Sequence, residues 1–501
     1  MTPRYGAAVL ARAFAAVAAV ISGLVSLRLF SVYLVPDEYG AVLVALQILG
    51  YLPFMACGFR MATNRRILAS GSDREKRSLI DFGQVCTTWL GIASLFVSLV
   101  LMLLYALSPT ALGANASVMF FVALAFAASL GFTRGLQVQL LIALRAQASV
   151  FVIMGMQALL YLVILWAGFR IGLGIFVFPV AGFVSSLLSF VVVIVLLRRH
   201  MPDLVFLRFR VDGDVQKRFL ELIREASDCL RCDLAIFMQY TVDLILVGVL
   251  AGPEAAAVYG IVTRLFAVLR GLLQSASEAA WPIAAECRAS GIAITQTVVR
   301  VNAWIYGAAA GVLWLCLVPF IRWYLGPEWT VDDTTAQFMI IRLLIVGVGT
   351  PLNFCLYGLG RFRFIRRCVE RELLVGVLVG TALGYWLGMR GVAVGFLVAT
   401  VFGILIPLPM GYAKEVGLRG FPLLVGMWAR ALTSGVASFL AVAFVPAASH
   451  VVVTLVLKGV SGMFAGVGAT LLTSIIRLRG SAPLAKSASM RDRVLFFLKG
   501  V

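Results

Sequence analysis

The dominant pattern in the sequence is a series of long apolar stretches separated by short breaks that hold charged residues, proline or glycine. A helix that crosses a bilayer needs roughly 20 consecutive, mostly apolar residues. The pattern predicts fourteen transmembrane helices, at residues 8–35, 39–61, 82–107, 116–143, 147–169, 172–197, 222–250, 254–286, 293–319, 334–359, 368–388, 391–412, 424–447 and 450–476. We therefore expect an all-α integral membrane protein.

The breaks between the predicted helices alternate in charge. Breaks after even-numbered helices carry most of the 42 Lys and Arg residues, with dense runs at residues 60–77, 198–224 and 361–371. Breaks after odd-numbered helices are short and contain few basic residues. Because loops rich in Lys and Arg stay on the cytoplasmic side, we expect both termini to be cytoplasmic, which agrees with an even number of helices.

Two short motifs recur at positions that are six helices apart. Residues 36–40 (Pro-Asp-Glu-Tyr-Gly) resemble residues 253–260, which contain Pro-Glu and Tyr-Gly, and the Trp-x-Gly-x-Arg pattern of residues 166–170 recurs at 386–390. Six is an even number, so the two halves share one orientation, and parallel repeats with a site between the halves occur in transporters. We expect an N-terminal lobe at 1–210, a C-terminal lobe at 211–422, two further helices at 423–479 and a basic cytoplasmic tail at 480–501.

The composition excludes a soluble protein. Of the 501 residues, 62% are hydrophobic and 13% charged, whereas a soluble domain has about a quarter charged residues. The net charge of the chain is +19. In a soluble protein such a charge indicates nucleic-acid binding, which requires a solvated basic patch. Here the basic residues lie in the loops between predicted membrane helices. We expect no nucleic-acid partner. Two histidines and eight scattered cysteines predict neither a metal site nor a disulfide framework.

Ionisable residues inside the predicted helices are the candidates for a functional site, because charge at membrane depth is costly unless it faces protein or water. The basic candidates are Arg28, Arg231, Arg264, Arg270 and Arg342. At a rise of 1.5 Å per residue, Arg28, Arg264 and Arg342 fall in the outer half of the bilayer. Arg231 and Arg270 fall in the inner half. The pattern predicts a hydrated cavity of positive potential, which suits an anion, and guanidinium groups suit phosphate in particular.

Three of these arginines have interpretations other than a position in the cavity. Arg231 stands three residues after Asp228, and Arg270 eight residues before Glu278, so each has an acidic neighbour on nearly the same helix face. Arg264 and Arg270 lie about 240° apart around one helix, so we do not expect both to face one cavity.

Asp243 is the acidic residue in the outer half of a predicted helix. Two interpretations stay open for it: a structural pair with Arg28 or Arg264, or a site for a coupling ion, H⁺ or Na⁺. No other cofactor is expected. Membrane-embedded glycosyl- or acyltransferases need acids or histidines in sizeable loops, and the outer loops here are short. We therefore expect no catalytic residues and no enzyme.

The chain resembles the Wzx-type lipid-linked oligosaccharide flippases, in the polysaccharide-exporter branch of the multidrug/oligosaccharidyl-lipid/polysaccharide (MOP) superfamily. The resemblance rests on residues 36–40, on residues 257–265 (Ala-Val-Tyr-Gly-Ile-Val-Thr-Arg-Leu) and on residues 277–285, which contain Trp281-Pro282. It implies a MATE-like fold of two six-helix lobes plus two helices. It also implies a cationic cavity, a role that we carry over to Arg28 and Arg264.

The function that the resemblance implies is translocation of an undecaprenyl-pyrophosphate-linked oligosaccharide across the bacterial inner membrane by alternating access. The product serves O-antigen, exopolysaccharide or capsule assembly, with a polysaccharide polymerase as an expected partner. Two alternatives stay open. One is a multidrug or cation extruder of the same superfamily, which should present intramembrane acids. In the outer half of the predicted helices, however, three arginines outnumber the one acid, Asp243. The other is a membrane subunit of a polysaccharide secretion complex.

Overall fold

The structure is a computed structural model that describes residues 3–55, 73–106, 120, 122–128, 138, 141, 146–200, 213–278, 288–445 and 451–480. Within these ranges the regular structure is helical. The chain forms two compact units, Met1–Val268 and Leu269–Val501.

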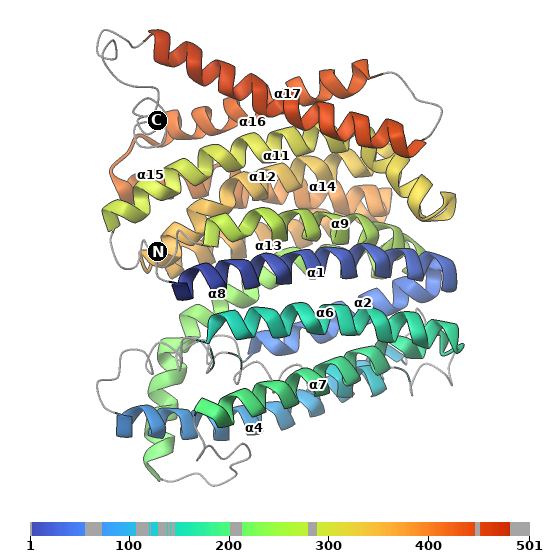
Figure 1. The fold of residues 1–501 in the computed structure, drawn as a ribbon, viewed down its shortest axis with the longest axis vertical. Helices are drawn as coiled ribbons and strands as arrows, with labels where there is room; N and C mark the ends of the chain where they lie inside the picture. The colour runs from blue at the N-terminus through green and yellow to red at the C-terminus, as the bar shows by residue number, and fades with distance from the viewer. Residues whose placement is uncertain are drawn as a thin grey trace. The chain divides into compact units, whose positions relative to one another are not determined.

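The helices of the first unit run from the N-terminus into α9 (Figure 1). They are α1 (Pro3–Tyr33), α2 (Pro36–Met55), α4 (Asp73–Ala106), α6 (Gln147–Arg170), the short η1 (Gly174–Phe176), α7 (Val177–His200), α8 (Gly213–Ala251) and the first part of α9 (Pro253–Glu278). Helix α6 packs against α1 and α7, and α2 packs against α4 and α8.

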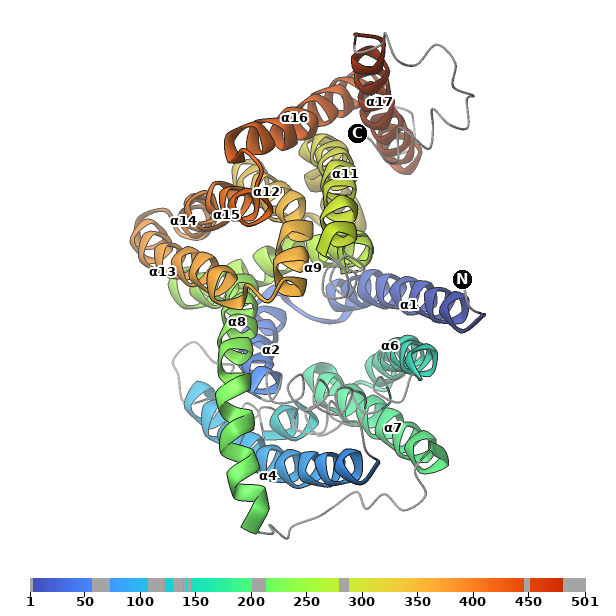
Figure 2. The same ribbon diagram turned by 90° about the vertical axis from the view of Figure 1, so that its left-hand side faces the viewer.

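The second unit continues from α9 and contains the remaining helices. They are α11 (Arg288–Tyr324), the short η2 (Pro327–Trp329), α12 (Asp333–Gly358), α13 (Phe362–Leu387), α14 (Met389–Thr400), the π-helical turn η3 (Val401–Leu405), α15 (Pro407–Val416), α16 (Gly420–Phe444) and α17 (Val451–Gly480). Helix α11 packs against α12, α16 and α17, and α13 pairs with α14 (Figure 2).

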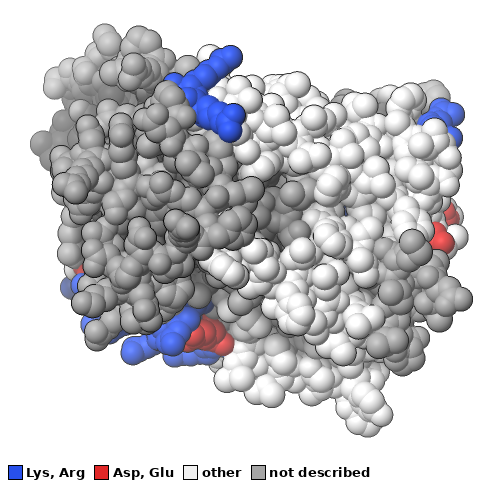
Figure 3. Space-filling model, turned by 90° about the horizontal axis from the view of Figure 1, so that it is seen from below, with Lys and Arg blue, Asp and Glu red and all other residues white. Residues whose placement is uncertain are grey.

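Helices occupy the predicted segments, which confirms the prediction of an all-α membrane protein. In the fourth segment, the described residues 120, 122–128, 138 and 141 are helical. Eight segments of the described chain are long and apolar enough to cross a membrane: Leu10–Tyr33, Ala148–Arg170, Gly174–Arg199, Leu234–Ala251, Ile292–Tyr324, Asp333–Gly358, Met389–Val416 and Gly420–Phe444. In Figure 3 the described residues include a broad uncharged area, with Lys, Arg, Asp and Glu at its margins.

The predicted twelfth helix, at 391–412, is interrupted. Helix α14 ends at Thr400, a π-helical turn follows, and α15 starts at Pro407. Proline lacks the N–H that would continue the hydrogen-bond ladder, which explains the break. Gly403 in the turn also packs on α13 so closely that an added Cβ would overlap Glu372.

The lobe boundaries at 210 and 422 stay predictions. Trp281-Pro282 and residues 481–501 of the predicted tail lie outside the described residues.

Candidate functional site

The best-defined charged site of the first unit surrounds Arg264 of α9. Its guanidinium carbon lies 5.8 Å from the centroid of the Phe30 ring on α1 and 5.6 Å from that of the Tyr39 ring on α2. Both rings are almost wholly buried, and Arg264 is half-buried. Among the described residues, no carboxylate forms an ion pair with Arg264. The guanidinium is thus held by two aromatic rings, and its hydrogen-bond donors are not used by an acidic partner in this part of the chain.

This geometry depends on close packing between the N-terminal ends of α2 and α9. An added Cβ at Gly40 would overlap the carbonyl group of Pro253, and one at Gly260 would overlap Leu43. Only glycine permits such an approach of two helices. The two copies of the sequence motif at 36–40 and 253–260 are therefore in contact, and this contact brings Tyr39 to Arg264.

Asp243 of α8 lies in the same unit and is 2% exposed. Its Oδ2 accepts a hydrogen bond from the Tyr259 hydroxyl at 3.1 Å, and its Oδ1 accepts one from the Leu244 amide at 2.8 Å. Tyr259 stands on α9, five residues before Arg264. The carboxylate of Asp243 therefore contacts the helix that carries the cation, although it forms no ion pair with Arg264 itself.

Arg28 and Arg231 have exposed side chains in the first unit. Arg28 stands two residues before Phe30, which is about 200° around a helix, and it shares the exposed face of α1 with Val25 and Val32. Its predicted role beside Arg264 stays a prediction. The pair of Arg231 with Asp228 is likewise untested, because the Asp228 side chain lies outside the described part.

Arg270 and Arg342 belong to the second unit and are half-buried. The guanidinium carbon of Arg342 lies 5.0 Å from the centroid of the Phe396 ring on α14. The side chain of Glu278, the alternative partner of Arg270, lies outside the described part. A cavity lined by arginines of both units stays a prediction.

Glu372 of α13 is a buried acid that the sequence analysis missed. It is fully buried, and the Thr400 hydroxyl of α14 donates a hydrogen bond to its Oε1 at 2.6 Å. In the sequence it looks like the end of the basic run at 361–371. A signal was present in the sequence, because glycines follow Glu372 at intervals of four, at Gly376, Gly380 and Gly384, and thus share its helix face. The structure buries all four residues.

Comparisons with known proteins agree with this architecture. The profile of the polysaccharide biosynthesis protein family matches residues 7–287, more than half of the chain. The structure is similar to the lipid II flippase MurJ in an inward closed conformation, with a TM-score of 0.74 and 12% sequence identity over 94% of this chain and 99% of that chain. No curated protein matches the sequence.

Two MATE transporter structures are also similar. One is an inward-facing multidrug resistance MATE family transporter of the MOP superfamily, with a TM-score of 0.61 and 12% identity over 83% of this chain and 94% of that chain. The other is the eukaryotic MATE transporter AtDTX14, with a TM-score of 0.57 and 17% identity over 85% of this chain and 99% of that chain. At these identities the similarity shows the fold.

The molecule is thus a multi-pass, all-helical membrane protein with a MurJ/MATE-like fold. The chain belongs to the polysaccharide biosynthesis protein family.

Proposed function

We propose that this transporter is a flippase that moves an undecaprenyl-pyrophosphate-linked oligosaccharide across the bacterial inner membrane by alternating access, for assembly of a surface polysaccharide. A polysaccharide polymerase would consume the product. The family and the MurJ-like fold support a polysaccharide-related substrate. The observation that carries the proposal is the guanidinium of Arg264, which lies over two adjacent buried rings, Phe30 and Tyr39.

The position of Arg264 suits a lipid headgroup. It stands eleven residues into α9, about 16 Å along the helix axis, which is near the middle of a hydrocarbon core about 30 Å thick. A guanidinium there is costly unless it meets protein, water or an anion. Cation–π contacts with Phe30 and Tyr39 restrain the guanidinium, and its planar fork of N–H donors matches two oxygens of a diphosphate.

Asp243 is our candidate for the coupling ion, H⁺ or Na⁺. Its hydrogen bond with Tyr259 connects it to α9, so that a change in the charge of the carboxylate alters the contact between α8 and the helix that carries Arg264. Arg28, Arg231, Arg270 and Arg342 are proposed as further contacts for the anionic headgroup.

The experiment is a comparison of surface polysaccharide in cells that produce the wild type, Arg264→Ala, Arg28→Ala or the control Arg170→Ala. Arg170 is a matched control because its guanidinium also stacks on a ring, 5.9 Å from the centroid of Trp166, at the end of α6. We expect loss of surface polysaccharide and accumulation of the lipid-linked precursor with Arg264→Ala and Arg28→Ala, at normal protein abundance. Normal polysaccharide with Arg264→Ala contradicts the proposal.

The same variants separate the flippase from the cation extruder. An extruder would export cationic drugs, with a loss of export for Asp243→Asn and little change for Arg264→Ala. A flippase leaves drug sensitivity unchanged in both variants.

A further inference from the structure

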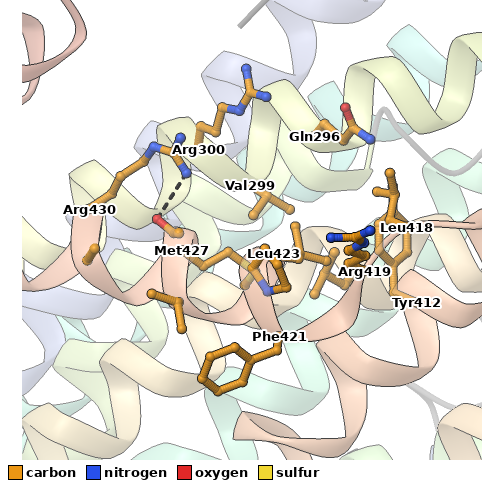
Figure 4. Close-up of a pocket in the computed structure, with 15 residues that line it drawn as sticks. Gln296, Val299, Arg300, Tyr412, Leu418, Arg419, Phe421, Leu423, Met427 and Arg430 are labelled. Carbon is orange, nitrogen blue, oxygen red and sulfur yellow. Dashed lines mark hydrogen bonds between the residues drawn. The ribbon is translucent and has the colours of Figure 1, made fainter. Parts of the chain in front are cut away.

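The second unit contains a cavity of about 720 Å³ between parts of α11, α12, α15 and α16 (Figure 4). Arg300 and Arg430 lie towards one side of this cavity, whereas Arg419 lies on the other. The Nη1 of Arg430 donates a hydrogen bond to the Gly426 carbonyl at 2.9 Å. These arginines do not converge on one point and therefore do not define an anion site. In the first unit, by contrast, a second polar side chain lies near Arg264.

This side chain is Tyr161 of α6, a helix that packs against α1. Tyr161 precedes Leu165 and Phe169 by four and eight residues, so the three share one side of the helix. Leu165 is fully buried, and the ring of Phe169 stacks on that of Tyr33 on α1, with 5.0 Å between the centroids. The half-buried side chain of Tyr161 therefore lies on the side of α6 that packs against α1.

Two contacts fix the level of Tyr161 along α1. An added Cβ at Gly155 of α6 would overlap the ring of Phe14, and Phe169 of α6 stacks on Tyr33. Phe14 and Tyr33 follow each other in α1 in the same order as their partners in α6, so the two helices run parallel. Tyr161 stands between the two partners in α6 and is therefore level with the middle of α1.

Helix α9 contacts the same middle part of α1. An added Cβ at Gly23 of α1 would lie 3.3 Å from the side chain of Val268 on α9. Arg264 stands one turn before Val268, and its guanidinium lies over Phe30, seven residues beyond Gly23. The middle of α1 thus brings α9 close to the level at which α6 carries Tyr161.

The depths of the two residues in the predicted membrane agree with this arrangement. Tyr161 stands nine residues before Arg170, the last residue of α6, and Arg264 stands eleven residues after Pro253, the first residue of α9. Both of these helix ends are at the outer surface in the predicted orientation. At 1.5 Å per residue, the two residues lie about 14 and 16 Å from that surface, so they share one depth.

The polar groups of these two residues interact but do not satisfy each other. The Tyr161 hydroxyl interacts electrostatically with the Arg264 guanidinium and with the Tyr39 hydroxyl. Within the described part of the chain, neither the Tyr161 hydroxyl nor the Arg264 guanidinium forms a hydrogen bond. A tyrosine hydroxyl in a protein interior normally has a hydrogen-bond partner, and a guanidinium has five N–H donors. Two neighbouring groups with unused donors favour a ligand that has several acceptor oxygens.

We propose that Tyr161 binds the substrate headgroup and that its hydroxyl donates a hydrogen bond to the diphosphate held by Arg264. This inference rests on the proposed function. The guanidinium supplies the charge, and the phenol supplies a neutral donor from a different helix. Because no hydrogen bond joins the two groups, the ligand has to reach from one to the other. A diphosphate is long enough to do so, whereas a monophosphate held by Arg264 leaves Tyr161 without an acceptor. Tyr161 is thus a residue that selects the diphosphate.

The test measures the affinities of the purified full-length protein in detergent for undecaprenyl diphosphate and undecaprenyl monophosphate. The variants are Tyr161→Phe, which keeps the ring and removes only the hydroxyl, and the control Tyr33→Phe. Tyr33 is a matched control because it lies in the same unit and its hydroxyl also forms no hydrogen bond in the described structure. We expect Tyr161→Phe to bind the diphosphate about tenfold more weakly, as for loss of a hydrogen bond to a charged group. Its affinity for the monophosphate should be unchanged, and the control should match the wild type with both lipids.

Two contrary results have different meanings. If Tyr161→Phe keeps the wild-type preference for the diphosphate, the hydroxyl does not bind the headgroup, and this inference alone is wrong. If the wild type itself binds the diphosphate no more tightly than the monophosphate, the proposed function fails and the role of Tyr161 fails with it.

A second measurement separates weaker binding from poorer folding. A ligand that binds only the folded state raises the thermal unfolding midpoint, so the shift caused by undecaprenyl diphosphate is taken from the ligand-free midpoint of each variant. We expect a smaller shift for Tyr161→Phe than for the wild type and Tyr33→Phe at the same lipid concentration. Equal shifts in all three proteins overturn the inference, whatever the ligand-free midpoints are.

Discussion

The ring of Phe30 on α1 supports the guanidinium of Arg264 on α9, with 5.8 Å between the ring centroid and the guanidinium carbon. Phe30 also stacks on Tyr39 and Phe178, with ring centroids 4.9 and 5.0 Å apart. The cation therefore lies on one edge of a buried aromatic cluster. A rigid cluster keeps the guanidinium in one orientation before a ligand arrives, which lowers the entropy cost of binding.

The first prediction concerns this support. Phe30→Leu removes the ring under Arg264, whereas Phe178→Leu removes a ring of the same cluster that makes no cation–π contact with Arg264 in the described structure. A cation–π contact is worth about 0.5–2 kcal/mol, so we expect Phe30→Leu to slow flipping by about two- to thirtyfold relative to Phe178→Leu. The measurement is the initial flipping rate in liposomes at equal protein content. Equal flipping rates for Phe30→Leu and Phe178→Leu would show that the Phe30 ring does not contribute to flipping.

The second prediction concerns the contact between the N-terminal ends of α2 and α9. Gly40→Ala places a methyl group on the Pro253 carbonyl, so we expect it to destabilise the protein by about 2 kcal/mol or more. Gly459→Ala on α17 is the control, since an added Cβ there meets no atom within 4 Å. Thermal unfolding in detergent, followed by intrinsic fluorescence, measures the difference. An unchanged thermal unfolding midpoint for Gly40→Ala would mean that α2 and α9 can move apart at this contact without destabilising the protein.

The third prediction concerns Asp243. Asp243→Asn keeps the size of the side chain and its acceptor oxygen but removes the charge. We expect flipping by this variant to lose its stimulation by an imposed H⁺ or Na⁺ gradient while slow downhill flipping continues. Flipping is measured in liposomes with each gradient in turn. Full stimulation of Asp243→Asn by either gradient assigns the aspartate a structural role.

The fourth prediction concerns the pair of Glu372 and Thr400. The Thr400 hydroxyl lies 2.6 Å from Glu372 Oε1 and 2.8 Å from the Phe396 carbonyl oxygen. Thr400→Val removes a buried partner of the acid, a loss of about 1–3 kcal/mol. Thr433→Val on α16 is the control, because this exposed hydroxyl bonds only its own helix in the described structure. We expect a lower thermal midpoint for Thr400→Val alone, and equal midpoints would contradict a stabilising hydrogen bond.

Much of the fold could be predicted because membrane helices follow directly from long apolar runs. The break in the twelfth helix could have been anticipated at Pro407. The π-helical turn before it places Gly403 in close contact with Glu372 of α13, a contact that no local sequence pattern reveals. The alternation of basic loops predicts the orientation of helices but not how they pack.

The candidate site was less accessible to sequence reasoning. Depth alone identified Arg264 and Asp243, since charges are rare at those positions. The same reasoning treated Arg28 as equal to Arg264, although Arg28 lies on the exposed face of α1. The partners of these charges could not be predicted, because Phe30 looks like an ordinary apolar residue in the sequence. Tyr39 and Tyr259 stand in the two repeated motifs, but the repeat does not show that they contact Arg264 and Asp243 until the helices are packed.

The most direct test of the central claim measures whether Arg264 recognises a diphosphate. The affinities of the wild type, Arg264→Lys and the control Arg170→Lys are measured for polyprenyl diphosphate and polyprenyl monophosphate in detergent. Lysine keeps the charge but lacks the planar fork of donors. The account predicts that the wild type and the control prefer the diphosphate by about tenfold, which corresponds to about 1.4 kcal/mol, and that Arg264→Lys loses this preference. An unchanged preference in Arg264→Lys would contradict it.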